Sequence, residues 1–270
     1  MLKDRIVAAI GRDNYVRHVM GLTNLYRAFR PFRHPGARLM RRALIPRGGV
    51  VLDIGANIGR FTALAARAVG RSGRVYSFEP VPMVLRALHT MVRLRRLGQV
   101  TIVEIALGDR NGTATINIPL KDGWKPLVPI AHLSAAAEPS TLSLSIAVER
   151  LDDLCEARGI QHVDFIKCDT EGGEFAAFSG ALNCLARDLP TVVCEISQEY
   201  LARQEVEPSA VFGIFTLLGY QCFLIDPDGT LTPVRGYDSP GDYLFVHPGT
   251  LSVEKLRGFI RQRAGSSISA

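Results

Sequence analysis

Long hydrophobic runs are missing from this 270-residue sequence. No apolar stretch approaches the roughly 20 residues that a membrane-spanning helix needs. Residues 1–14 also lack the uninterrupted apolar core of a secretory signal. We therefore expect no transmembrane span, and we expect the protein to work in the cytoplasm.

Cysteine is sparse as well, with five residues, an odd number, and no C-x-x-C spacing. Cys168, Cys194 and Cys222 fall inside apolar, strand-like runs, which is typical of buried thiols. This pattern argues against a disulfide framework or a cysteine metal site, and it suits a reducing compartment.

The glycine fingerprint of dinucleotide-binding proteins, G-x-G-x-x-G, is absent where a nucleotide-binding unit otherwise begins. An apolar run at 50–52 is followed by the pattern D-x-G-x-N-x-G, made by Asp53, Gly55, Asn57 and Gly59. A helical repeat of apolar residues then starts at position 61. Glycine lets the backbone approach a ligand closely, and the N-terminus of a helix presents free N–H groups to it.

A second predicted strand, residues 74–78, ends at Glu79, whose carboxylate can accept hydrogen bonds from a ribose diol. Asp53, two residues before the first glycine, suits a cationic amino-acid group better than a pyrophosphate. The arrangement resembles the S-adenosylmethionine (SAM) site of class I methyltransferases. The plain alternative is a strand–helix turn that merely needs a glycine or two, and the spacing to Glu79 disfavours it.

Basic residues are unevenly distributed along the chain. Residues 1–49 hold eleven Lys and Arg against two Asp, whereas the remaining residues hold 21 Lys and Arg against 24 Asp and Glu. The charge belongs either to a solvated helix face or to a site for an anionic substrate or carrier, a membrane surface or, least favoured, nucleic acid.

The sequence divides into a basic helical arm over 1–47, a main domain over 48–250 and a helix or tail over 251–270. The arm carries an apolar stripe at helical spacing that should pack on the main domain, at Leu22, Leu25, Tyr26 and Phe29. Alternating strand and helix patterns in the main domain predict an α/β fold with a parallel sheet. Its last two strands, 220–225 and 243–247, should form a closing pair around a turn at 226–229.

Acidic residues stand at the ends of five predicted strands: Asp53, Glu79, Glu104, Asp169 and Glu195. The carboxyl ends of parallel strands meet at one edge of a sheet, where ligands bind. Asp169, with Glu171 and Glu174 close behind, is the candidate reaction centre. Lys167 shares a strand face with Asp169, and a structural ion pair is a better explanation for it than direct catalysis.

Residues 119–144 break the strand and helix patterns and hold five proline or glycine residues. We predict an inserted loop that serves either as a substrate lid or as an ordinary surface insertion. Trp124, the only tryptophan, and His132 are its candidate substrate-binding residues, together with Glu171 from the main domain.

Six stretches together resemble the FkbM-type methyltransferases over about residues 48–248. They are VVLDIGANIGRFT, VYSFEP, ALGDRNG, RLDDL, VDFIKCDTEGGE and YLFVHP. The sequence departs from the family at His89 and at 93–96, where asparagines are common, and at Cys168 and Thr170. The resemblance implies a Rossmann-like class I methyltransferase fold, with a seven-stranded, mostly parallel sheet whose last strand is antiparallel.

The resemblance also implies SAM as the cofactor and methyl transfer to a substrate hydroxyl. The implied cofactor-binding positions are Asp53, Gly55, Asn57, Gly59, Glu79, Glu104, Ala106 and Asp169. A general base would raise the rate by roughly 10²–10⁴; Asp169 is the first candidate, Glu195 the second and His132 the third. Alternatively, Asp169, Glu171 and Glu195 hold a divalent ion that acidifies the hydroxyl, although we favour a metal-free site.

The resemblance favours an O-methyltransferase for a saccharide or another natural-product acceptor. Methylation of a different nucleophile, such as an amine, or of a lipid-linked acceptor brought in by the basic arm, is the alternative enzyme. A non-catalytic SAM-binding protein and a nicotinamide oxidoreductase are hypotheses from different functional classes. We expect no nucleic-acid partner, and the arm leaves a peripheral membrane contact open.

Overall fold

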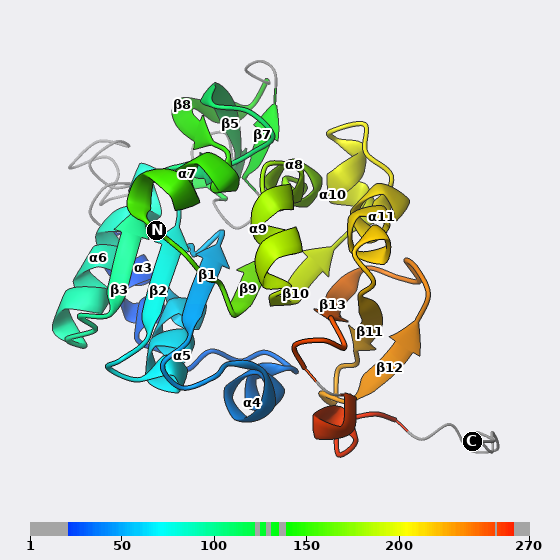
Figure 1. Ribbon diagram of the computed structural model, residues 1–270. Coiled ribbons are helices and arrows are strands. Elements are labelled where there is room, and N and C mark those ends of the chain that lie inside the picture. Colours follow the sequence, from blue (N-terminus) through cyan, green and yellow to red (C-terminus); the bar gives the residue numbers. More distant parts are fainter. Residues whose placement is uncertain (1–20, 122–124, 128–130, 135–138, 252, 262–270) are drawn as a thin grey trace, which may run out of the picture.

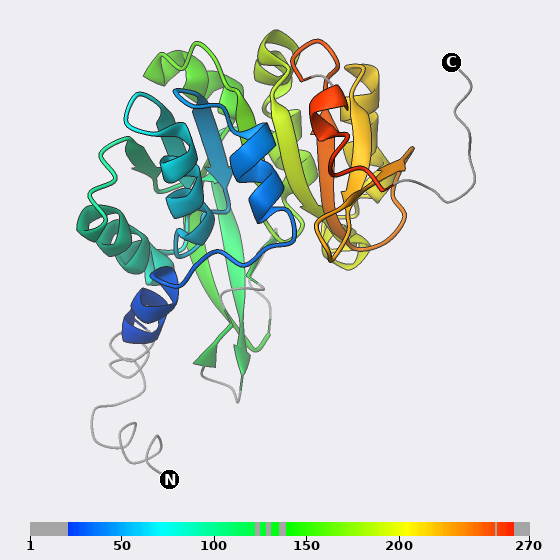
Figure 2. The same cartoon turned by 90° about the horizontal axis from the view of Figure 1, so that it is seen from below.

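The computed structural model describes residues 21–121, 125–127, 131–134, 139–251 and 253–261. Two β-sheets and the helices around them make up this part of the chain (Figures 1 and 2). Within these ranges, no helix combines the length and the apolar character that crossing a bilayer requires.

Eight strands form the larger sheet, in the spatial order β12-β11-β13-β10-β9-β1-β2-β3. Their bounds are β1 Val50–Ile54, β2 Arg74–Phe78, β3 Val100–Val103, β9 Phe165–Cys168, β10 Thr191–Ile196, β11 Gln221–Ile225, β12 Leu231–Val234 and β13 Gly241–Val246. β12 and β13 run against the other six. The predicted α/β class, with a mostly parallel sheet and an antiparallel last strand, is confirmed, but the predicted count of seven strands is wrong.

The additional strand, β12, follows a turn in which the Gly229 N–H donates to the Asp226 carbonyl at 2.8 Å. This turn sends the chain back along β11, and β13 then forms between β10 and β11. Pro233 hides β12 in the sequence pattern, because proline is rare in central strands. It is tolerated here because β12 lies at the edge of the sheet.

The described part of the arm contains α3 (Gly21–Ala28), α4 (Ala37–Leu39) and the π-helical turn η2 (Met40–Leu44). Leu39, Met40 and Leu44 are buried against the main domain. As predicted, α3 packs on the main domain, but it contacts α6 through Asn24 and Ala28 and not through the predicted apolar stripe. The small Ala28 lets the two helices approach closely. Of the predicted stripe, Leu25 is half-buried, whereas Leu22 is 69% exposed, Tyr26 68% and Phe29 37%.

Helices cover both faces of the larger sheet (Figure 1). They are α5 Arg60–Val69, α6 Pro82–Leu94, α7 Leu151–Arg158, α8 Glu174–Ser179, α9 Leu182–Asp188, α10 Gln198–Ala202 and α11 Pro208–Leu217. Val51 and Phe165 face an apolar cluster with α5, α4 and η2, whereas Leu52 and Ile166 face another with α7, α8, α9 and α11. Burial on both faces explains why the central strands read as near-continuous apolar runs.

The five cysteines are free thiols, and four of them are buried. Cys168 and Cys194 are fully buried in central strands, and Cys222 is half-buried in β11. The prediction of thiols in place of disulfide bonds is confirmed.

The smaller sheet consists of β4 (Ala106–Leu107), β5 (Gly112–Lys121), β6 (Lys125–Pro126), β7 (His132–Ser134) and β8 (Thr141–Glu149). β5 and β8 pair as a long antiparallel ribbon from Gly112–Val148 to Pro119–Thr141. The stretch 119–144 is therefore not a loop throughout, because the alternation of residues 113–118 continues along both strands. Trp124 lies outside the described residues, and the role of a lid stays a prediction.

Candidate active site

The turn after β1 is built around backbone that only small residues permit. Gly55 and Asn57 have φ values of 79° and 50°, so the predicted tight conformation at Asn57 is confirmed. A Cβ atom on Gly55 would collide with the carbonyl oxygen of Asp169, and one on Gly59 would collide with side chains of α6. These glycines therefore let the β1 turn pack against the end of β9 and against α6.

Glu79, at the end of β2, ties two strand ends together. Its Oε2 atom accepts the Asn57 N–H at 2.8 Å, and its Oε1 atom accepts the Val81 N–H at 2.8 Å. Burial raises the pKa of Glu79 to about 7, although both backbone bonds oppose this rise. Each carboxylate oxygen has a second lone pair and can accept a further hydrogen bond from a ligand.

The side chain of Asp53 is fully buried, so it lies in the protein interior behind the site. Thr62 Oγ1 donates to Asp53 Oδ2 at 2.5 Å, and Asp53 Oδ1 has no hydrogen-bond partner among the described residues. Burial raises the pKa of Asp53 to about 6, and the charge of Lys167 partly counteracts this effect. Asp53 therefore belongs to the buried support of the site.

The buried Lys167 and the half-buried Asp169 form an ion pair at the end of β9, with 2.6 Å between Nζ and Oδ2. Burial alone would lower the pKa of Lys167, but the charges of Asp169 and Asp53 raise it above its ordinary value. Burial alone would likewise raise the pKa of Asp169, but Lys167 holds it below its usual range. Lys167 is thus a permanent cation that keeps Asp169 ionised, as the predicted ion pair requires.

Glu195 and Glu171 flank Asp169, and their pKa values are much higher than that of Asp169. Burial raises the pKa of Glu195 to about 8, and the charge and hydrogen bonding of Asp169 add to the rise. Burial, followed by the charges of Asp169 and Glu174, raises the pKa of Glu171 to about 7. At neutral pH Glu195 and a large fraction of Glu171 therefore retain their protons, while Asp169 is ionised.

Glu174 has a structural role. Its carboxylate accepts the Thr170 N–H at 3.0 Å, the Thr170 hydroxyl at 2.8 Å and the Gly172 N–H at 3.1 Å. These bonds hold the turn between β9 and α8, which carries Glu171 at a φ of 57°.

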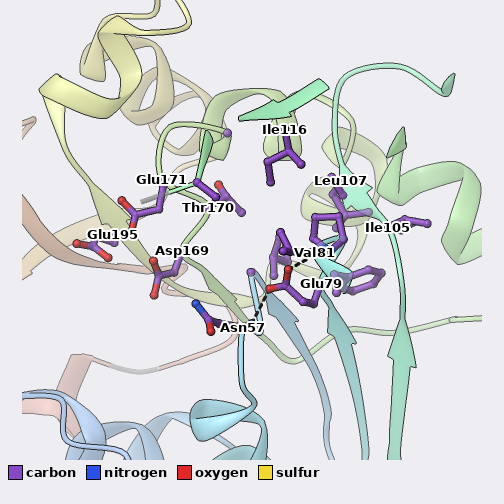
Figure 3. Close-up of a pocket in the computed structure, with 17 residues that line it drawn as sticks. Asn57, Glu79, Val81, Ile105, Leu107, Ile116, Asp169, Thr170, Glu171 and Glu195 are labelled. Atoms are coloured by element: carbon purple, nitrogen blue, oxygen red, sulfur yellow. Dashed lines mark hydrogen bonds between the residues drawn. The ribbon is translucent and has the colours of Figure 1, made fainter. Parts of the chain in front are cut away.

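These groups line one cavity of about 260 Å³ (Figure 3). Asp169, Glu171 and Glu195 make an acidic wall on one side. The opposite wall is apolar and includes Phe78, Val81, Ile105, Leu107 and Ile116. Asn57 and Glu79 lie between the two walls, so the cavity combines an apolar slot with a cluster of hydrogen-bond acceptors.

The structure brings most of the predicted site residues to this cavity. Those on its wall are Gly55, Asn57, Glu79, Ala106, Asp169, Glu171 and Glu195. Asp53, Gly59 and Lys167 lie behind the wall. Glu104 points elsewhere, with its Oε1 atom 2.8 Å from His89 Nε2, and His132 is buried in β7 opposite Asn117.

His34 and Asp242 belong to the surroundings of the site and were missed by the sequence reasoning. Asp242 pairs with Glu195 across β10 and β13, and His34 Nε2 lies 2.8 Å from Asp242 Oδ2. His34 Nδ1 accepts the Gly36 N–H at 2.9 Å, whereas Nε2 makes no well-aligned hydrogen bond to a described residue. Only the strand register could have revealed Asp242, and no local pattern marks His34.

Comparison with known proteins identifies the family. The family model "Methyltransferase FkbM domain" matches residues 53–222, which include the end of β1 at Asp53 and the whole of β2, β9 and β10 with their acidic ends. This chain belongs to the FkbM methyltransferase family. The predictions of the family, of a class I methyltransferase fold and of SAM as the cofactor of this domain are confirmed.

One curated relative is the 2-O-methyltransferase NoeI of Sinorhizobium fredii (strain NBRC 101917 / NGR234). It is 29% identical over 151 residues, which cover 51% of this chain and 59% of the relative. The chain thus spans about three-fifths of the length of the curated relative that it matches.

Two solved structures have a similar chain course. The FkbM methyltransferase of Methylobacillus flagellatus KT has a TM-score of 0.46 and 18% identity, over 86% of this chain and 60% of that one. The fibrillarin of Aeropyrum pernix, with natively bound SAM, has a TM-score of 0.41 and 15% identity, over 78% and 72%. The family assignment depends on the family model and not on these two likenesses.

The residues of the cavity fit SAM. Its apolar slot suits a purine, Glu79 offers free lone pairs to ribose hydroxyls, and the acidic wall suits a ligand with cationic groups. Among the residues that the structure describes, no three His, Cys, Asp or Glu side chains are grouped as metal ligands. The divalent ion on Asp169, Glu171 and Glu195 stays an untested alternative.

Proposed function

We propose that this chain transfers a methyl group from SAM to a hydroxyl group of a saccharide or another natural product. The observation that carries the proposal is the acidic wall, where Glu195, with a pKa of about 8, lies beside an ionised Asp169. SAM supplies a methyl group on a positively charged sulfur. The chain has to bind the donor, place the hydroxyl in line with that methyl group and remove the hydroxyl proton.

Glu195 is the general base in this proposal. A base works best when its pKa is close to the working pH, and Glu195, with a pKa of about 8, acts through its ionised fraction, which grows as the pH rises toward 8. Asp169 is less suited, because Lys167 holds its pKa below the usual range. We therefore place Glu195 ahead of Asp169, which reverses the order that the sequence suggested.

Asp169 acts as the neighbour that makes Glu195 basic. Its negative charge opposes a second charge on Glu195, so Glu195 binds a proton readily. The same charge favours a cationic donor. Lys167 fixes Asp169 from below at 2.6 Å and keeps it ionised while Glu195 changes its protonation state.

The relative NoeI is a 2-O-methyltransferase, which supports an oxygen acceptor. The acidic wall favours one second candidate, methylation of an amine, because carboxylates attract a protonated amino group. A lipid-linked acceptor, a non-catalytic SAM-binding role and a nicotinamide oxidoreductase rank below these two candidates.

The test uses the full chain with SAM and a panel of glycans and natural-product alcohols, each paired with its amine analogue. Formation of S-adenosylhomocysteine and of the methylated product is followed by mass spectrometry. We expect turnover with one or more alcohols and not with their amine analogues. Turnover with the amines alone would overturn the oxygen acceptor, and calorimetric binding of NADH without SAM binding would overturn the methyltransferase proposal.

The role of Glu195 is tested with Glu195→Gln. We expect turnover to fall by roughly 10²–10⁴, because an amide cannot take the proton, while SAM affinity stays within a few fold. The matched control is Glu199→Gln on α10, an exposed carboxylate whose Oε1 lies 3.2 Å from Arg203 Nη2. Equal turnover in the two variants would show that Glu195 is not the base.

A further inference from the structure

A second and larger cavity, of about 670 Å³, lies at the opposite end of the main sheet from the candidate active site. Asp164 and Thr191, on its wall, stand at the start of β9 and β10, whereas Asp169 and Glu195 stand at the ends of these strands. Five residues at about 3.3 Å each separate Asp164 from Asp169, or about 16 Å. Residues 41–47 of the arm and Arg67 and Ala68 of α5 form one side of this cavity.

Positive side chains from three separate parts of the chain surround this second cavity. They are Arg41, Arg42 and Arg47 from the arm, Arg67 from α5 and Lys255 near the C-terminal end of the described chain. All five are exposed, and none has a hydrogen bond or ion pair to another side chain in the described ranges. Their like charges therefore meet at one place, where five cationic side chains face only two carboxylates on the described wall.

The two carboxylates on the wall of the second cavity are already engaged. Asp164 Oδ2 accepts the Val50 N–H at 2.8 Å. Asp188 Oδ2 lies 2.6 Å from Arg187 Nη2 and also accepts the Val163 N–H at 2.9 Å. These contacts hold the starts of β1 and β9 in place, so the carboxylates are part of the scaffold.

The chemistry of the wall selects the class of ligand. Guanidinium groups bind phosphate oxygens through paired N–H donors, and arginine is favoured over lysine where such pairing matters. A volume of 670 Å³ falls in the usual range for small-molecule sites, about 300–1,000 Å³. The described wall has no Phe, Tyr or Trp on which a base could stack, which argues against single-stranded nucleic acid.

We propose that this second cavity binds the phosphate group of a phosphorylated ligand, held by Arg41, Arg42 and Arg67. The ligand is distinct from the methyl acceptor, because the reacting hydroxyl has to reach the opposite end of the sheet. The phosphate belongs either to a soluble metabolite or to the headgroup of an anionic lipid.

The experiment titrates the full chain with inorganic pyrophosphate by calorimetry at low ionic strength. We expect saturable binding of one pyrophosphate per chain, weakening steeply with added salt. The double variant Arg41→Gln/Arg42→Gln should weaken binding about tenfold or more, because two charged donors are lost. Arg67→Gln, on a different helix, should weaken it as well, which shows that one site joins the two elements.

The matched control is Arg86→Gln/Arg93→Gln, which removes the same charge from two exposed positions of α6. Its pyrophosphate affinity should stay close to that of the unaltered chain, and SAM affinity should be unchanged in all variants. An equal loss of pyrophosphate affinity in the control would show that the effect depends only on net charge, and it would overturn the proposal. Absence of saturable binding, or binding of citrate as tight as that of pyrophosphate, would also overturn it.

A vesicle experiment separates the two sources of phosphate. Sedimentation of the chain with phosphatidylglycerol vesicles, but not with phosphatidylcholine vesicles, and its reversal by pyrophosphate would assign the site to a lipid headgroup. Pyrophosphate binding without vesicle binding would assign it to a soluble phosphorylated ligand.

Discussion

The two ends of the main sheet carry opposite charges that are built in opposite ways. At the ends of β1, β2, β9 and β10, carboxylates are buried or half-buried, connected by hydrogen bonds and shifted in pKa. At the starts of β9 and β10, arginines are exposed and have no partner in the described chain. Burial makes the first end sensitive to pH and to single-atom changes, whereas exposure makes the second sensitive mainly to salt.

The largest expected difference between the two ends comes from adding one methyl group. Gly55 and Gly48 have nearly the same backbone, with φ values of 79° and 77°, but only the Cβ of Gly55 would collide with backbone, at Asp169. We expect Gly48→Ala to lower the free energy of unfolding by about 1 kcal/mol, the usual penalty for this conformation. Gly55→Ala should lower it by about 3–5 kcal/mol, because strain and overpacking add.

Urea denaturation of both glycine variants measures this difference. Similar losses would mean that the turn after β1 relaxes away from β9 at little cost. In that case, the close contact between the two strand ends would not be what shapes the site.

The second prediction compares an ion pair whose lysine is buried with a pair in which neither side chain is buried. Asp169→Asn leaves Lys167 buried without its closest partner and should lower the free energy of unfolding by about 3 kcal/mol. Asp153→Asn breaks the exposed pair with Arg150, whose atoms are 3.2 Å apart, and should cost less than about 1 kcal/mol. Thermal and urea unfolding check both values, and a small loss for Asp169→Asn would indicate that Asp53 alone compensates Lys167.

The third prediction concerns the dependence of stability on pH. Asp53, Glu79, Glu171 and Glu195 have folded-state pKa values of about 6, 7, 7 and 8, above those of the unfolded chain. Between about pH 5 and pH 8 the folded chain therefore binds more protons than the unfolded chain. These groups should make the free energy of unfolding fall as the pH rises through this window.

Urea denaturation at pH 5, 6, 7 and 8 measures this slope. Glu195→Gln should flatten it above pH 7, because the group with the highest of these pKa values is gone. A free energy of unfolding that rises from pH 5 to pH 8 would contradict the raised pKa values of these carboxyl groups.

The smallest expected effect concerns the arginines at the starts of β9 and β10. Arg41→Gln/Arg42→Gln should raise the free energy of unfolding by about 0.5 kcal/mol at low salt, since like charges are relieved. The gain should vanish in about 0.5 M NaCl, where screening is strong. Unfolding at the two salt concentrations tests it, and Arg86→Gln/Arg93→Gln serves as the control. A gain that persists at high salt would rule out charge repulsion as its cause.

Much of the acidic site at the carboxyl ends of the strands could be predicted from the sequence, because strand ends are local features. Gly55, Glu79, Asp169 and Glu195 follow recognisable apolar runs, and parallel pairing alone brings such ends together. The face through which α3 packs could not be predicted. Leu22 and Tyr26 give it a convincing apolar stripe, but the small Ala28 fits the surface of α6 better.

The surroundings of Glu195 and the second cavity depend on contacts between distant segments. Asp242 becomes a neighbour of Glu195 only through the register of β13 on β10, and His34 reaches it from the arm. The arginines stand out in the sequence as a charge excess, but only the fold unites Arg41 with Arg67 and with Lys255. Sequence patterns specify elements, whereas tertiary packing specifies which of them meet.

The position of β13 has a consequence for synthesis of the protein. β13 comes late in the sequence but lies between β10 and β11. The sheet is therefore incomplete until residue 246 has left the ribosome. Until then β10 presents an unpaired edge, and an emerging chain with such an edge is prone to aggregate. Truncation before Gly241 would therefore remove Asp242 and leave the edge of β10 unpaired. Such a chain would be prone to aggregate and would be expected to bind chaperones.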